Sequence, residues 1–335
     1  MRKTAKKRKH GGKSFGKGAH GEAFNVGDDQ AEPTFYSNLR VNPIRSIRIF
    51  SPEGEETYTT EQEKEQFIQY IRITRDKMAK VFLPCKTIEA DFLEEINKNR
   101  KIIDIYGELV EKYTTISPLP PVFRNYMLGC IVDYENNEKT YAVFNTKCNN
   151  SYVITDLKKF ALDIIESIII LQTQSYEHND IKLDNIVKCG EDYKLIDWGQ
   201  SSAILNPQRK AGTLLSTNPV RWYLLGHSHL NSKYRMQFQT LRKNWRFSRS
   251  KLFTDTYARI IREYNEITDE IKDKKGLVKK YVYTFDIFML GMTMLHAVFK
   301  FGLEIDKFMP VIDKFTSLIN PVKNAFEAKE IISAV

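Results

Sequence analysis

The chain contains little cysteine and no long apolar run. Its 335 residues include four cysteines, with no Cys-x-x-Cys pair and no histidine nearby at metal-ligand spacing. The cysteines are Cys85, Cys130, Cys148 and Cys189. This pattern argues against a structural zinc site and a disulfide framework, and it favours a reducing, intracellular setting. Because no apolar stretch approaches the length of a membrane span and the first residues lack a signal-peptide core, we expect no membrane partner.

Acidic residues are absent from residues 1–13, and basic residues are concentrated there. Residues 2–13 contain seven lysines and arginines, whereas the whole chain has a formal net charge of +9. The rest of the chain is therefore close to neutral. We predict a basic flexible tail over residues 1–12. Such a tail suits a nucleic acid, an acidic partner or a nuclear import receptor, and a disordered solubilising end is an equal alternative.

Apolar and aromatic residues are plentiful. They make up 42% of the chain and include 20 phenylalanines and 17 tyrosines. This content is sufficient for a large buried core, and the length allows one large or two moderate domains.

The residues with the clearest chemistry lie between His178 and Asp197. Asp180, Lys182 and Asn185 occur within six residues, so they share one loop. Two short strand signals separate Asn185 from Asp197, which predicts a β-hairpin that returns the second carboxylate to the first. Phosphoryl transfer needs one carboxylate at the attacking hydroxyl, and a second carboxylate with an amide oxygen for Mg²⁺.

This ordered set resembles the catalytic half of the protein kinase superfamily. The resemblance implies an α+β, bilobal fold with a small β-rich N-lobe and a mainly helical C-lobe. The N-lobe would span residues 13–148 with an insertion at about 27–76. The C-lobe would span residues 149–335 with an insertion at about 225–280.

The N-terminal half contains further matches to the kinase pattern. Gly16, Gly18 and Gly21 have the spacing of a loop that covers phosphates, although a flexible glycine linker has the same composition. Lys80 lies in a strand-like segment, and Glu95 follows fifteen residues later, with Glu94 as the second choice. In the family, this lysine contacts the α- and β-phosphates and the glutamate pairs with it.

Local patterns predict four elements around these motifs. A capping box at Thr60–Glu63 begins a helix that runs to about Arg75 and packs on the small lobe. Residues 126–134 and 140–145 form a hairpin, and an apolar helix runs from residue 157 to 172. A second apolar helix contains Asp286, which must accept hydrogen bonds and resembles the aspartate that braces the kinase catalytic loop.

Two features of the C-terminal half bear on specificity and partners. Thr213 with Lys182 resembles the serine/threonine class, whereas Asn179 replaces the arginine that contacts a phosphorylated activation loop in the family. Residues 233–251 combine seven basic residues with aromatic residues and contain no acid. Stacking on nucleic-acid bases uses such a mixture, but a solvated, partly packed helix is the preferred interpretation.

The resemblance implies a serine/threonine protein kinase that uses ATP and Mg²⁺, or Mn²⁺, on protein substrates. Asp180 and Lys182 would be catalytic, and Asn185 and Asp197 would hold the metal. Two alternatives remain open: a small-molecule phosphotransferase of the aminoglycoside or choline kinase type, and a pseudokinase scaffold. The expected location is the cytoplasm or nucleus. The composition also resembles that of kinases of large DNA viruses, for which host cell or virion would be the location.

Overall fold

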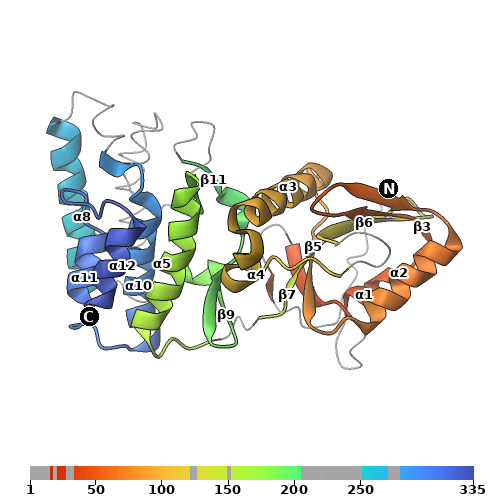
Figure 1. Ribbon diagram of the computed structural model, residues 1–335, viewed down its shortest axis with the longest axis horizontal. Coiled ribbons are helices and arrows are strands. Elements are labelled where there is room, and N and C mark those ends of the chain that lie inside the picture. Colours follow the sequence, from red (N-terminus) through yellow and green to blue (C-terminus); the bar gives the residue numbers. More distant parts are fainter. Residues whose placement is uncertain are drawn as a thin grey trace, which may run out of the picture. The chain divides into compact units, whose positions relative to one another are not determined.

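The computed structural model describes residues 16–17, 21–27, 34–120, 127–148, 152–204, 220, 251–270 and 280–335. The chain divides into two compact units (Figure 1). The first contains the residues up to Ile103 together with Thr115–Lys147, and the second contains Asp104–Thr114 and Cys148–Val335. The fold is mixed α+β, with an antiparallel sheet in the N-terminal region and helices in the C-terminal part.

The first unit is built on an antiparallel sheet. Over the described residues the sheet has seven strands in the order β1-β2-β5-β7-β6-β3-β4. The strands are β1 (Gly16–Lys17), β2 (Gly21–Asn25), β3 (Ile44–Phe50), β4 (Glu55–Tyr58), β5 (Lys77–Phe82), β6 (Gly129–Tyr134) and β7 (Lys139–Thr146). Strands β6 and β7 form the predicted hairpin.

Helices cover both faces of this sheet. Cross-strand partners share a face, so Ala79 with Phe144 lies on one face and Lys80 with Val143 on the other. Helices α1 (Phe35–Leu39) and α2 (Glu61–Ile73) cover the Ala79 face, where they contribute to one buried apolar cluster. Helix α3 (Ile88–Tyr106) covers the Lys80 face.

The segment predicted as an insertion at about 27–76 forms part of the sheet. Its helix α2 begins after the predicted capping box, in which Thr60 and Glu63 satisfy each other's backbone N–H, and it ends at Ile73. Phe67 and Ile71 of this helix are fully buried, which confirms that it packs on the N-terminal sheet. The segment also supplies β3 and β4, two strands that were not predicted from the sequence.

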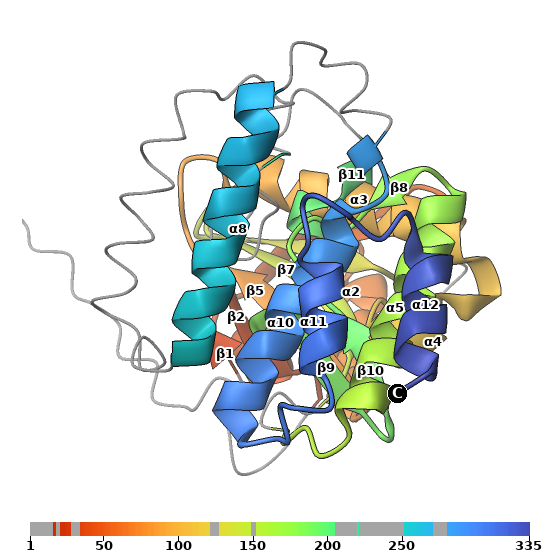
Figure 2. The ribbon, with the colours of Figure 1, turned by 90° about the vertical axis from the view of Figure 1, so that its left-hand side faces the viewer.

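The described part of the second unit is mainly helical (Figure 2). The longer helices are α5 (Leu157–Thr173), α8 (Lys251–Glu270), α10 (Phe285–Phe301), α11 (Met309–Phe315) and α12 (Ala325–Ser333), and a short helix α4 spans Val110–Tyr113. The described part of the unit also contains hairpin β9 (Ile186–Cys189) and β10 (Asp192–Leu195), the pair β8 (Tyr176–Glu177) and β11 (Ser202–Ala203), and three short 3₁₀ segments. These segments are η1 (Gly107–Leu109), η2 (Leu183–Asn185) and η3 (Trp198–Gln200).

Helix α5 is a buried core helix, as predicted. It begins where the Asp156 side chain accepts the N–H of Lys159, and its apolar residues are largely buried. Its two interior carboxylates have partners: Asp163 accepts from Tyr193 N–H and Glu166 accepts from the Tyr113 hydroxyl. In the described parts of the chain, no helix is long and apolar enough to span a membrane.

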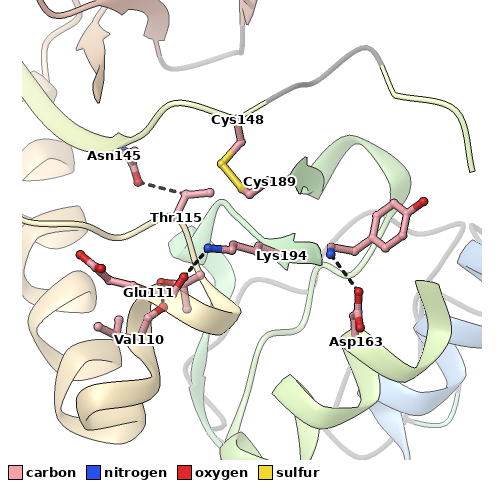
Figure 3. The surroundings of a disulfide bond; sticks show 10 residues. Val110, Glu111, Thr115, Asn145, Cys148, Asp163, Cys189 and Lys194 are labelled. Atoms are coloured by element: carbon pink, nitrogen blue, oxygen red, sulfur yellow. Dashed lines mark hydrogen bonds between the residues drawn. A yellow bond between two sulfur atoms is a disulfide. The ribbon is translucent and has the colours of Figure 1, made fainter. Parts of the chain in front are cut away.

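The cysteine prediction was wrong, because Cys148 and Cys189 form a disulfide (Figure 3). The two residues are 41 positions apart, and the fold places their Cα atoms 4.8 Å from each other, within the range for such a bond. No short-range motif reveals this pair, since Cys189 ends strand β9 and Cys148 follows strand β7. Cysteine usage therefore no longer supports a reducing setting.

Candidate functional site

The β9–β10 hairpin positions the two predicted metal ligands. Ile186 pairs with Leu195, and the N–H of Ile196 donates to the carbonyl of Asn185 over 2.9 Å. Asp197 is the next residue, so the hairpin returns it to the side of Asn185. The local prediction from the two strand signals is confirmed in this respect.

Asp180 lies at the centre of a compact polar cluster. Its Oδ2 accepts from Lys182 Nζ at 2.7 Å and from Asn185 Nδ2 at 2.8 Å. The same Asn185 nitrogen also donates to the Asp180 carbonyl at 2.9 Å. Three residues predicted from one sequence motif are thus brought into direct contact around a single carboxylate.

The charge state of Asp180 follows from its surroundings. The residue is only 6% exposed, and burial alone would raise the pKa of the carboxyl group. The Lys182 ammonium and the Asn185 amide act in the opposite direction and hold the pKa below its usual value. Asp180 is therefore a carboxylate at neutral pH, able to accept a hydrogen bond from a substrate hydroxyl.

Asp286 fixes the backbone of this loop from helix α10. Its Oδ2 accepts the N–H of His178 at 2.8 Å, and its Oδ1 accepts the N–H of Asn179 at 2.9 Å. The aspartate is 2% exposed, so these two donors compensate for the burial of a charge. The predicted bracing role of Asp286 is confirmed.

His178 connects the loop to the residue before Asp197. Its Nε2 lies 3.1 Å from the Ile196 carbonyl, and its Nδ1 accepts from Asp180 N–H at 3.3 Å. These partners require a neutral ring with the proton on Nε2. Burial lowers the pKa of His178, which maintains that neutral form, although neighbouring carboxylates oppose the shift. The Trp198 ring, 4.6 Å from the imidazole, packs on it and on Tyr106.

Asn185 and Asp197 offer oxygen atoms of the type that Mg²⁺ binds. The hydrogen bonds of Asn185 use Nδ2, so its Oδ1 is available as a ligand. Asp197 is exposed, has a left-handed backbone with φ of 61°, and its carboxylate forms no hydrogen bond or ion pair with the described residues. Nowhere in the described ranges do three or more His, Cys, Asp or Glu side chains gather as a metal site. Asn185 and Asp197 are therefore the two residues of this site that could contribute oxygen ligands to a divalent cation.

The first unit contains a separate ion pair between Lys80 and Glu95. Lys80 Nζ on β5 lies 2.6 Å from Glu95 Oε2 on α3, and both side chains are partly buried. Glu94, the second choice for this partner, instead pairs with Lys98 on the exposed side of the helix. The structure therefore selects Glu95.

The structure describes two of the three glycines of the predicted phosphate-covering loop, Gly16 and Gly21. Gly16 pairs with Ala23, and Gly21 pairs with Phe82 on the strand that carries Lys80. A Cβ at Gly21 would lie 2.8 Å from the Val81 carbonyl oxygen, so the close approach of the two strands requires glycine. Gly18 lies outside the described residues, as do residues 2–13, Thr213 and residues 233–250.

Comparison with known proteins adds no family assignment. A scan of protein-family models gives no match for this chain, and a search of curated proteins gives none. The likeness to protein kinases therefore remains a hypothesis that depends on the residues of the chain itself.

Proposed function

We propose that this protein is an ATP-dependent protein kinase with a bilobal kinase-like fold that phosphorylates serine or threonine. The observation that carries the proposal is the contact of Lys182 and Asn185 with the Asp180 carboxylate, beside Asp197. A carboxylate, an ammonium group and two metal-type oxygens in one place are the groups that phosphoryl transfer uses.

Each residue has a role in this proposal. Asp180 orients the substrate hydroxyl and accepts its proton, while Lys182 stabilises the negative charge of the transferring phosphoryl group. Asn185 and Asp197 would hold Mg²⁺ or Mn²⁺, which supplies positive charge against the phosphate oxygens when bound. Together these groups position the reactants and stabilise charge, which is the main source of catalysis in this reaction class.

The nucleotide-binding side would be formed by the first unit. Lys80, held by Glu95, would contact the α- and β-phosphates, and the backbone of Gly16, Gly18 and Gly21 would cover them. The partly buried ion pair keeps the lysine ammonium at a fixed place on the sheet. The proposed cofactor is therefore Mg-ATP.

Protein substrates are favoured over small alcohols by Lys182. The aminoglycoside and choline kinase type shares the loop aspartate, the asparagine and the Ile196-Asp197-Trp198 sequence, but not this lysine. The 2.7 Å contact between Lys182 and Asp180 supports a functional rather than a solvated lysine. A scaffold without catalysis is disfavoured by the complete set of polar groups.

The test is phosphate transfer from labelled Mg-ATP to generic acidic and basic proteins. We expect phosphoserine or phosphothreonine, and a loss of roughly 10²-fold or more in Asp180→Asn and Asp197→Asn. Asp192→Asn is the matched control, because this exposed aspartate on the same hairpin pairs with Lys159 at the surface. Equal activity in Asp197→Asn and the control would overturn the metal assignment.

Other outcomes separate the alternatives. Transfer to small alcohols but not to proteins would indicate the small-molecule class. Absence of Mg-ATP binding in the native chain would favour the scaffold.

A further inference from the structure

Helix α3, which carries Glu95, packs closely on the Lys80 face of the sheet. The Phe92 ring contacts Phe50 of β3 at 5.2 Å between centroids and Phe82 of β5 at 5.8 Å. Gly129 of β6 permits this approach, since a Cβ there would lie 2.8 Å from the Ile96 side chain. One aromatic side chain of the helix therefore bridges β5 and β3.

Polar contacts add a directional restraint at the C-terminal side of Glu95. Arg100 Nε donates to the Ser51 carbonyl at 2.8 Å, and Arg100 Nη2 donates to the Gly54 carbonyl at 2.6 Å. Both carbonyls belong to the turn between β3 and β4, where Ser51 N–H also donates to the Gly54 carbonyl. A guanidinium with two donors on two carbonyls fixes direction as well as distance.

A second contact restrains the N-terminal side of the helix. Arg48 Nη2 on β3 lies 2.7 Å from Glu89 Oε1 on α3, and the Tyr141 hydroxyl donates to the other oxygen of Glu89. Glu95 lies between Glu89 and Arg100 on the same helix. The β3–β4 hairpin therefore contacts α3 before and after the residue that pairs with Lys80.

We propose that the β3–β4 hairpin, residues 44–58, determines the position of α3, and that Arg100 is a positioning residue for the Lys80–Glu95 pair. The expected effect on nucleotide binding rests on the proposed function, whereas the expected effect on the position of α3 does not. The hairpin lies within the segment predicted as an insertion, so this chain uses added strands to hold a helix that bears a functional side chain.

On the C-terminal side of Glu95, helix α3 forms further side-chain hydrogen bonds, because Arg100 Nη1 donates to Asn97 within the helix and the Tyr106 hydroxyl donates to the Ser167 carbonyl. Lys98 pairs with Glu94 within the helix, and Arg100 reaches the hairpin. Loss of the Arg100 guanidinium removes both bonds to the hairpin while leaving the Phe92 packing in place. The helix would then remain folded but shift relative to β5.

The experiment measures the accessibility of the Lys80 amine in the intact chain. An ammonium group paired with a carboxylate is acylated slowly, because acylation requires the neutral amine. Acetic anhydride labelling followed by mass spectrometry gives the rate at Lys80. We expect Arg100→Ala to raise this rate severalfold, towards that of Glu95→Gln, and Arg100→Lys to restore part of the protection.

Two controls separate positioning from a general loss of stability. Arg45→Ala removes an arginine from β3 that contacts the β6–β7 turn instead of α3. Ile71→Val weakens the core on the opposite face of the same sheet. Both variants should leave the labelling rate at Lys80 unchanged. A rate in Arg100→Ala equal to that of the native chain, or an equal increase in Ile71→Val, would overturn the proposal.

Nucleotide kinetics then test the functional consequence. We expect the KM for ATP to rise on the order of tenfold in Arg100→Ala, with a smaller change in the KM for the protein substrate. An unchanged KM for ATP alongside increased Lys80 labelling would overturn the link to nucleotide binding. Absence of ATP binding in the native chain would refute the proposed function, whereas the labelling result would still decide the role of Arg100.

Discussion

The two units fix their polar side chains by different means. In the second unit, Asp180 is held in a short loop whose backbone N–H groups donate to the buried carboxylate of Asp286. In the first unit, Lys80 and Glu95 meet from different elements, and their alignment depends on partly exposed arginine contacts. Buried bonds to backbone are costly to remove, whereas exposed ion pairs contribute little each. We therefore expect unequal sensitivity to mutation.

We expect the largest effect at Asp286. A small effect there would contradict the expected difference in sensitivity between the two units. Asp286→Ala leaves the buried N–H groups of His178 and Asn179 without an acceptor, so we expect a loss of about 4 kcal/mol in the free energy of unfolding. Asp286→Asn retains one acceptor oxygen and should lose less. Denaturant titration measures both, with the exposed Asp306→Ala as control, for which a change within about 0.5 kcal/mol is expected.

The disulfide tests how much of the rigidity of the second unit is covalent. It closes a loop with a sequence separation of 41, so its removal increases the conformational freedom of the unfolded chain. We expect Cys189→Ser to lower the free energy of unfolding by about 3 kcal/mol. A reductant should lower the native value similarly and leave the variant unchanged. The free, exposed Cys85→Ser is the control and should behave as the native chain.

Acidification should affect the second unit through buried histidine. Burial lowers the pKa of His296 from 6.5 to about 4. The unfolded state then binds a proton at higher pH than the folded state, so stability present above pH 6.5 is lost as the pH falls towards 4. We expect a loss of about 2 kcal/mol between pH 7 and pH 5. His296→Leu should lose less over this interval, although His178 contributes in the same direction.

The smallest effect should distinguish the buried face of helix α2 from its exposed face. Ile71→Val removes one methylene from the fully buried cluster under α2 and should cost about 1 kcal/mol. The neighbouring Ile73 is 69% exposed, so Ile73→Val should change the free energy of unfolding by less than about 0.5 kcal/mol. Equal losses at the two positions would contradict the burial of α2 against the sheet.

Local sequence signals predicted the elements that depend on neighbouring residues. The Thr60–Glu63 capping box gives the start of α2, and the apolar periodicity gives α5 and the helix of Asp286. These features require no knowledge of distant contacts. The spacing from Lys80 indicated Glu95 with Glu94 as the second choice, and the ion pair with Lys80 decided between them.

Distant pairings could not be predicted in the same way. Strand β3 pairs with β6, whose residues are more than 70 positions away along the chain. The Cys148–Cys189 disulfide, across 41 positions, and the bonds from Arg100 to the β3–β4 turn, across 49 and 46 positions, are also distant pairings. Each depends on how the sheet or hairpin is assembled, and no residue type at fixed spacing indicates it. The roles in phosphoryl transfer remain predictions.

Strand β4 also has a consequence for self-association. It is the last strand of the described sheet order, so its outer backbone groups are not covered by a further strand of that sheet. Exposed strand edges recruit strands from other molecules unless they are short or charged. Strand β4 has four residues and begins with Glu55 and Glu56. The β3–β4 hairpin thus ends the described sheet with a short strand that carries negative charge, which disfavours pairing with a strand of another molecule.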